Sequence, residues 1–95
     1  MTGLSYAAAA ILNSIRSGHP YGFDIMDAVG LPSGTVYPAL RKLEKAGLIR
    51  SQWERESLAR ADQRPARRYY QVTRAGESAV AEAAQKYRFP QEAAR

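Results

Sequence analysis

The triplet Gly-Leu-Pro at residues 30–32 constrains this fold most, because it separates two short amphipathic segments with almost no linker. Proline prevents the first segment from continuing as a helix, so the chain must turn sharply here. Residues 21–29 predict a short helix with an inner side made of Phe23, Met26 and Val29. The next helix, the third of the chain, begins directly after the triplet, with Ser33 predicted as its N-cap.

The segment that starts at Ser33 has one apolar face and one basic face. Its apolar residues recur at helical spacing, at Val36, Leu40 and Leu43. Its opposite face carries Tyr37, Arg41, Lys42 and Lys45. Pro38 is expected in the first turns, where few helical donors are lost. Gly47 is expected to end the helix in the left-handed conformation.

The remaining segments predict a helix on each side and a hairpin between them. Residues 4–17 form a first helix through an apolar stripe of Leu4, Ala8, Ile11, Leu12 and Ile15. Residues 48–56 predict a strand, 57–66 a polar loop, and 67–73 the return strand. Thr73 is predicted to cap a last helix over 74–88, which Pro90 ends. The fold class is therefore mainly α with a two-stranded β-hairpin wing, the winged helix-turn-helix.

The positive charge is concentrated in one part of the chain. The net charge is +5, and ten of the fourteen Lys and Arg residues lie between positions 33 and 74, with four of the nine acidic residues. This distribution favours a face turned toward a polyanion. The alternative is a solvated, arginine-rich surface.

Double-stranded DNA is the polyanion that this arrangement fits. The first turn of the third helix offers backbone N–H groups to a phosphate. Arg41 can bind guanine through two hydrogen bonds, and Lys42 suits a phosphate. Arginines of the wing can reach a phosphate or the minor groove, although Arg68 can instead belong to the strand. The predicted DNA-binding residues are Ser33, Gly34, Thr35, Tyr37, Pro38, Arg41, Lys42, Arg64, Arg67 and Arg68.

Other residues predict packing rather than chemistry. One of Tyr69 and Tyr70 is expected in the core and the other over the sheet, and Trp53 is expected to pack. His19 has no histidine or cysteine near it in the sequence, and the chain has no cysteine, so neither a metal site nor a cofactor is predicted. With no nucleophile–base pair or phosphate loop, an enzyme is not expected. No apolar run is long enough to cross a membrane and no leader pattern is present, so a cytoplasmic protein is predicted.

Several of these motifs together resemble the PadR family of transcriptional regulators over residues 4–80. They are Ser-Gly-Thr-Val at 33–36, Tyr-Pro-Ala-Leu-Arg-Lys-Leu-Glu-Lys-Ala-Gly-Leu-Ile at 37–49, Tyr21-Gly22, Trp53-Glu54, Arg-Arg-Tyr-Tyr-Gln-Val-Thr at 67–73, and Gly76. The resemblance implies a winged-helix dimer that represses transcription, with the third helix in the major groove and the wing on the flanking backbone or minor groove. It also implies a dimer interface between the first and last helices, and in many members release from DNA by a small aromatic compound.

This chain departs from the family pattern in three places. Its last helix is short, and its wing is basic without a glycine run. Its single tryptophan, Trp53, lies in the first strand, so the resemblance does not extend to a drug pocket between tryptophans at the dimer centre.

Small residues on the first and last helices favour a two-fold dimer. Residues 1–73 are predicted to form the winged-helix DNA-binding domain, and 74–95 a dimerisation helix in the same structural unit, with helix 4–17 in the interface. The dimer centre could hold a ligand or pack solid, and its predicted residues are Leu4, Ala8, Ile11, Val80, Ala84 and Tyr87. The predicted function is a dimeric, sequence-specific repressor that binds a pseudo-palindromic operator with half-sites about 10 bp apart. A homodimer with double-stranded DNA and a small aromatic effector as partners is expected. The alternative is a winged-helix protein-interaction module that does not bind specific DNA.

Overall fold

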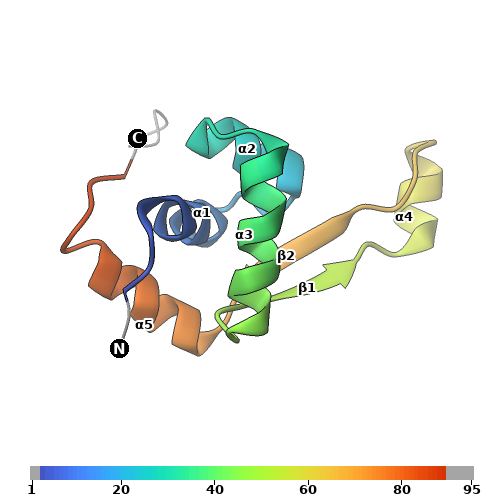
Figure 1. Cartoon of the computed structure of the whole chain (residues 1–95). Helices are drawn as coiled ribbons and strands as arrows, with labels where there is room; N and C mark the ends of the chain where they lie inside the picture. The colour runs from blue at the N-terminus through green and yellow to red at the C-terminus, as the bar shows by residue number, and fades with distance from the viewer. Residues whose placement is uncertain (1–2, 90–95) are drawn as a thin grey trace.

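The computed structural model describes residues 3–89 as three helices, a hairpin with a helical tip, and a final helix (Figure 1). In chain order the elements are α1 (Tyr6–Arg16), α2 (Gly22–Val29), α3 (Ser33–Lys45), β1 (Ile49–Trp53), α4 (Glu56–Ala61), β2 (Arg68–Val72) and α5 (Arg74–Ala83). The predicted fold class, mainly α with a two-stranded hairpin, is confirmed.

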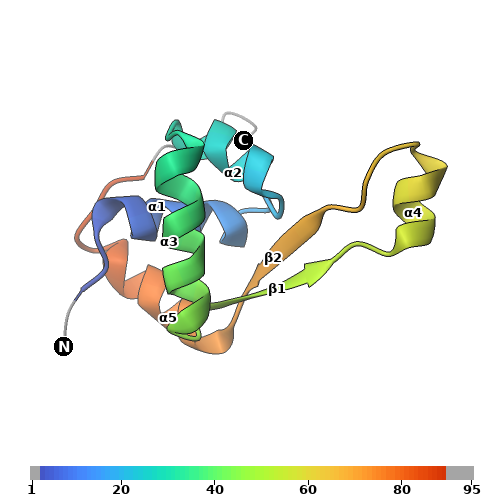
Figure 2. The ribbon, with the colours of Figure 1, turned by 45° about the vertical axis from the view of Figure 1, so that its right-hand side comes forward.

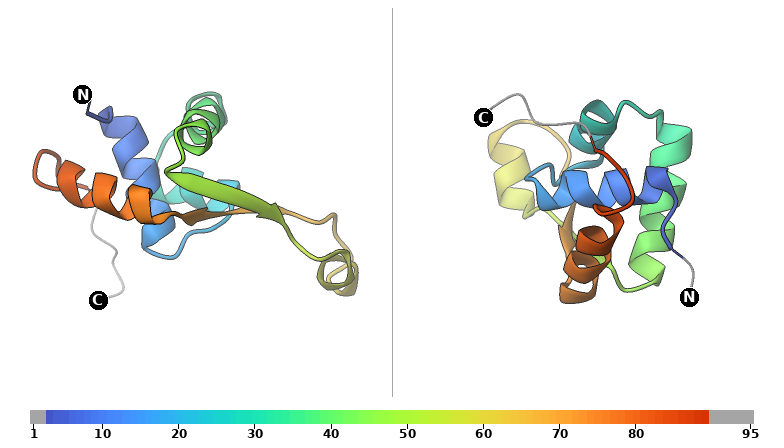
Figure 3. Two further views of the ribbon diagram at one scale, coloured as in Figure 1. Left: turned by 90° about the horizontal axis from the view of Figure 1, so that it is seen from below. Right: turned by 90° about the vertical axis from the view of Figure 1, so that its left-hand side faces the viewer.

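Helix α1 forms the centre of the core. It contacts α2, α3, α5 and β2, and the right panel of Figure 3 shows it crossing the middle of the molecule among the other helices. Its Ile11 and Leu12 are fully buried. The predicted apolar face of α3 is confirmed, because its three members are buried against α1: Val36, Leu40 and Leu43. The faces of α1 and α3 that pack together leave the opposite face of α3 to solvent.

The helix ends agree with the sequence in part. Gly47 has a φ of 79° and ends α3 in the left-handed conformation, as predicted. Thr73 caps α5, since its hydroxyl oxygen accepts the N–H of Gly76 at 3.1 Å. The N-cap of α3, however, is Pro32 rather than Ser33. Proline is extended here, and its carbonyl accepts the first helical N–H groups, which leaves the exposed Ser33 hydroxyl free of a capping role.

One residue of the helix-turn-helix lies as predicted and one does not. Pro38 is the sixth residue of α3, within its first two turns, and only the helical hydrogen bond to the Gly34 carbonyl is lost. Phe23 is 72% exposed rather than on the inner side of α2. The inner stripe of this two-turn helix starts one residue earlier, at Gly22, and continues through Ile25, so Phe23 falls outside it.

Strands β1 and β2 pair antiparallel, with Ile49 opposite Val72 and Trp53 opposite Arg68. Figure 2 shows this hairpin extending away from the helices, and the left panel of Figure 3 shows the same from below. Tyr70 is buried and Tyr69 is half-buried, which confirms the division predicted for this pair. Trp53 is 65% exposed, so the expectation that it packs is wrong. It ends β1, where the hairpin has left the helical body.

The predicted polar loop over 57–66 contains a helix, α4, at the tip of the hairpin. Its sequence, Glu-Ser-Leu-Ala-Arg-Ala, consists mostly of strong helix formers. Ala59 is 2% exposed, and its carbonyl accepts the N–H of Arg64 at 3.1 Å, which turns the chain back toward β2. The wing is therefore a folded tip rather than an open loop.

Helix α5 ends at Ala83, five residues before its predicted end. The chain then folds back onto the start of α1, where the Tyr87 hydroxyl donates to the Leu4 carbonyl at 2.8 Å. The Tyr87 ring packs edge-on against Tyr6, with centroids 5.5 Å apart. These contacts between distant segments compete with continuation of the helix. Pro90 and the rest of the predicted segment to residue 95 lie outside the described residues. None of the helices in residues 3–89 has the length and apolar character needed to cross a membrane.

Candidate nucleic-acid interface

The outward face of α3 carries unpaired positive charge. Its exposed residues are Ser33, Gly34, Thr35, Tyr37, Arg41, Lys42 and Lys45, with Pro38 half-buried among them. Within residues 3–89, neither Arg41, Lys42 nor Lys45 forms an ion pair. Their charges are therefore available to a polyanion that approaches this face.

Tyr37 packs closely against a glycine of the preceding helix. A Cβ atom added to Gly22 would lie 2.8 Å from Tyr37 Cζ and closer still to its hydroxyl oxygen. The absence of a side chain at Gly22 thus lets the Tyr37 ring lie across the first turn of α2. This contact gives the Tyr21-Gly22 pair of the sequence a structural reason.

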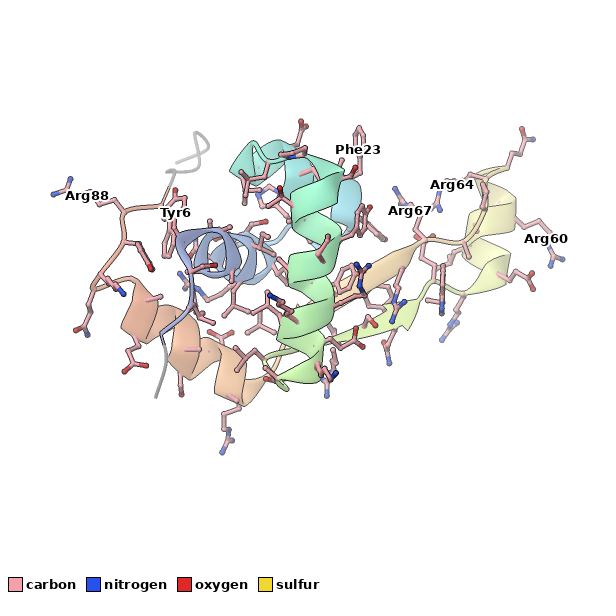
Figure 4. The ribbon with its side chains drawn as sticks, in the orientation of Figure 1. Tyr6, Phe23, Arg60, Arg64, Arg67 and Arg88 are labelled. Carbon is pink, nitrogen blue, oxygen red and sulfur yellow. The ribbon has the colours of Figure 1, made fainter. Side chains whose placement is uncertain are left out.

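A groove of about 460 Å³ lies between α3, the first turn of α2 and the hairpin. Three arginines line it, namely Arg41 from α3 together with Arg67 and Arg68 from the wing. Its other walls include the aromatic residues Tyr21, Phe23, Tyr37, Trp53 and Tyr70. Phe23 on α2 and Arg67 on the segment that returns from α4 are labelled in Figure 4. The groove therefore joins the basic face of α3 to the wing.

Glu54 connects the base of the wing to the segment before α2. Its side chain is 8% exposed and accepts hydrogen bonds from Arg64 at 2.6 Å and 3.0 Å. It also accepts from the Tyr21 hydroxyl at 3.0 Å and from the backbone N–H of Arg67 at 3.1 Å. The Arg64 guanidinium is the main cause that holds the pKa of Glu54 well below its usual range. Donation to Glu54 is likewise the main reason that the pKa of Tyr21 is raised.

The three predicted wing arginines lie in different environments. Arg64 is turned toward Glu54 and Asp62, and its side chain is only 25% exposed. The guanidinium of Arg67 lies 4.0 Å from the centroid of the Tyr21 ring, and Arg68 donates to Ser51 Oγ at 2.9 Å. The Arg67 and Arg68 side chains remain about half exposed on the groove. Arg64 is thus placed to support the wing, while the other two can meet a ligand.

The structure adds residues to the site that the sequence does not predict to bind DNA. Tyr21, Phe23 and Trp53 line the groove, although packing is predicted for the last two. Glu54 does not line it but accepts the Tyr21 hydroxyl. The pairs Tyr21-Gly22 and Trp53-Glu54 were a usable signal, because each places a groove residue beside a residue with a tertiary contact. Hydrophobic periodicity alone could not show it, since the partners are far apart in sequence.

A second hollow, of about 550 Å³, lies between α5, the N-terminal segment and Leu48. Leu4 and Tyr87, two of the predicted dimer or ligand residues, line it. Ile11 and Val80 do not, because both are fully buried in the core of the protomer. Ala8 is half-buried, and Ala84 is exposed just beyond α5. The predicted set is therefore divided between this surface and the core.

Comparison with known proteins agrees with the geometry. A model of the transcriptional regulator PadR-like family matches residues 11–82. This chain belongs to that family. PadR-like proteins are transcriptional regulators and not enzymes. No curated protein gives a significant match to the chain.

Solved structures of PadR relatives superpose well on it. A PadR family transcription regulator from hypervirulent Clostridium difficile is 26% identical, with a TM-score of 0.75 over 86% of each chain. A transcriptional regulator from Clostridium thermocellum is 25% identical, with a TM-score of 0.71 over 85% of this chain and 79% of that one. A PadR-like regulator from Bacillus cereus is 26% identical, with a TM-score of 0.68 over 83% and 78%. The PadR-like domain is thus similar to its relatives over most of its length.

Proposed function

We propose that this PadR-like regulator is a sequence-specific repressor that binds a pseudo-palindromic operator as a homodimer. The observation that carries the proposal is the outward face of α3, where Arg41, Lys42 and Lys45 form no ion pair within the described residues. A folded protein gains little stability from three unpaired cations side by side, whereas a phosphate backbone rewards them. A position in the family of transcriptional regulators supports the same conclusion.

The dimensions of α3 suit the major groove. Its 13 residues span about 20 Å, and the major groove is about 12 Å wide. In this proposal Arg41 reads a base edge, and Lys42 contacts a phosphate. Ser33, Gly34, Thr35, Tyr37 and Pro38 form the leading part of the contact surface.

The groove beside α3 then receives the DNA backbone. If α3 occupies the major groove and the wing reaches the adjacent minor groove, the strand that separates the two must pass between them. The groove lined by Arg41, Arg67 and Arg68 has that position. The guanidinium groups of Arg67 and Arg68 suit the phosphates of that strand, beside the base contact assigned to Arg41. Arg64 is assigned a supporting role, because its guanidinium is bound to Glu54.

The hollow beside α5 is proposed as part of the dimer face. It is lined mainly by small and apolar side chains, among them Leu4, Leu48 and Ala79. A second protomer placed there would cover them and set two copies of α3 against two half-sites. The volume of the hollow lies in the range of small-molecule sites, so an aromatic effector that releases DNA would bind there.

The DNA-binding proposal is tested by fluorescence anisotropy with a duplex from upstream of the protein's own gene and a scrambled duplex. Measurements at two salt concentrations separate phosphate contacts from base contacts. We expect a preference of about 10³-fold or more for the cognate duplex. Arg41→Ala should lower this preference, at a cost of about 1–3 kcal/mol, while Lys42→Ala should weaken both duplexes alike.

The matched control is Arg88→Ala, since Arg88 lies at the opposite end of the molecule from the wing (Figure 4). It removes the same charge and should leave both affinities unchanged. Equal effects of Arg41→Ala and Arg88→Ala would contradict the assignment of α3. No binding at low salt would favour the protein-interaction module instead.

The dimer is tested by sedimentation equilibrium. Ala84→Glu adds a charge to an exposed position at the end of α5 and should shift the protein toward monomer. Ala61→Glu makes the same change at an exposed position on α4 and should not. A wild-type protein that is monomeric at the concentrations used for DNA binding would refute the dimer.

A further inference from the structure

An acidic residue, Glu54, lies at the base of the wing among three of the wing arginines, Arg64, Arg67 and Arg68. Glu54 directly follows β1, and its side chain is 8% exposed. A carboxylate here repels phosphate and so does not bind DNA itself. Its near-complete burial and its set of donors indicate a different role.

Two separate parts of the chain converge on this carboxylate. Tyr21 precedes α2, while Arg64 and Arg67 lie in the one segment that joins α4 to β2. The Tyr21 hydroxyl, the Arg64 guanidinium and the Arg67 backbone N–H all donate to it. In addition, the Glu54 N–H donates to the Arg67 carbonyl at 2.8 Å, one position beyond the last pair of the strands. Glu54 thus closes the base of the wing and ties it to the helix-turn-helix.

The same contacts orient an arginine of the groove. The Arg67 guanidinium lies over the Tyr21 ring at 4.0 Å, and that ring is held by its hydroxyl on Glu54. Arg64 neutralises the carboxylate through two hydrogen bonds. The guanidinium of Arg67 therefore keeps its exposed half for the groove, with only a longer contact of 3.5 Å to Glu54.

We propose that Glu54 is a positioning residue for DNA binding: it latches the wing to Tyr21 and so sets Arg67 at a fixed place relative to α3. The latch is the group Tyr21, Glu54, Arg64 and Arg67. This inference rests on the proposed DNA-binding function. It goes beyond that function because it makes Glu54, an acidic residue that does not touch DNA, necessary for the DNA contact of Arg67.

The first measurement is made without DNA. Hydrogen–deuterium exchange of a peptide that covers residues 55–67 reports how firmly the wing is held in the full-length protein. Glu54→Gln keeps the shape of the side chain and removes its charge, and Tyr21→Phe removes only the hydroxyl donor. Both should raise exchange in this peptide. The matched control is Tyr69→Phe, which removes a hydroxyl that donates to Gln52 on the same hairpin. It should not raise exchange there.

The second measurement is DNA affinity as a function of salt. Glu54→Gln should weaken binding about tenfold, the effect of losing one charge-assisted contact. It should also lower the slope of log K against log salt by about 1, because one phosphate contact contributes about 0.9. A general loss of stability in a protein that remains folded would leave this slope unchanged. Because Glu54 and Arg67 act through one phosphate contact, the double variant Glu54→Gln/Arg67→Ala should bind DNA no more weakly than Arg67→Ala alone.

The outcomes distinguish failure of the latch from failure of the DNA-binding function on which it rests. Unchanged exchange in Glu54→Gln overturns the latch, whatever the DNA result. Raised exchange with wild-type affinity and slope, or additive effects with Arg67→Ala, overturns the positioning role. A wild-type protein that binds no duplex refutes the DNA-binding function itself, and the latch is then judged by exchange alone.

Discussion

Gly76→Ala should destabilise this protein, although alanine is the better helix former. Gly76 is buried in the first turn of α5. A Cβ atom there would lie 2.6 Å from Val72 Cγ1, 3.0 Å from the Leu48 carbonyl carbon, and closer still to the Leu48 oxygen. That oxygen belongs to the backbone and already accepts the N–H of Thr73 at 3.0 Å, so it cannot rotate away. Relief requires α5 to move away from the end of α3.

The expected magnitude follows from two opposing effects. Overpacking costs about 1–3 kcal/mol, and contact with rigid backbone favours the upper end. Replacement of glycine in a helix returns about 1 kcal/mol. A net loss of about 2 kcal/mol lowers the midpoint of thermal unfolding by about 8–16 °C in a domain of this size.

The assay is circular dichroism melting at one protein concentration, since association shifts the midpoint. Gly34→Ala is the control, because a Cβ atom at Gly34 in α3 meets no atom within 4 Å. It should leave the midpoint unchanged or raise it, by up to about 1 kcal/mol of stability. A Gly76→Ala protein that melts at or above the wild-type midpoint would refute the packing argument.

Three further predictions concern the cap, the latch and the groove. Thr73→Ala removes the cap of α5 and a hydroxyl that donates to the Gly47 carbonyl at 2.7 Å. It should lower the free energy of unfolding, measured with denaturant, by about 1–2 kcal/mol. The control, Thr35→Ala at an exposed position, should change that free energy by less than about 0.5 kcal/mol. Because the pKa of Glu54 is lowered in the folded protein, the latch contributes its full stability above the ordinary pKa of about 4.5 and loses it as pH falls through the lowered value. Exchange in residues 55–67, corrected for its intrinsic pH dependence, should therefore be constant from about pH 8 to 5, and a Glu54-dependent rise within that window would contradict this. Trp53 is the single tryptophan and is 65% exposed on the groove, so its fluorescence should change when a DNA duplex binds. The DNA concentration at half-change should equal the midpoint of the anisotropy titration. A constant fluorescence signal would argue against DNA in the groove.

The sequence predicted those features that depend on local spacing. The apolar stripes of α1 and α3 are buried as expected, because a period of 3.6 residues places them on one side of a helix whatever the partner is. Gly47 and Thr73 were recognised as helix ends from conformational preference and capping chemistry. The outward position of Arg41 and Lys42 follows directly from the buried stripe of α3.

The tertiary structure decided the features that depend on distant partners. Trp53 and Phe23 look like core residues in any window of the sequence, yet both rings line the groove. Trp53 does so because the hairpin extends away from the helices, and Phe23 because the buried side of α2 is formed by Gly22 and Ile25. Helix α5 stops early because Tyr87 finds Leu4 and Tyr6 at the other end of the chain.

The division among the wing arginines has the same origin. In the sequence Arg64 and Arg67 are equivalent cations on either side of Pro65-Ala66. Folding brings Glu54 against Arg64 and leaves the Arg67 guanidinium over Tyr21, half exposed to the groove. The sequence by itself determined that this part of the chain is basic. Only the fold determined which of these charges are paired inside the wing and which remain available to a ligand. The reason is that a charge is neutralised by its neighbours in space and not by those in sequence.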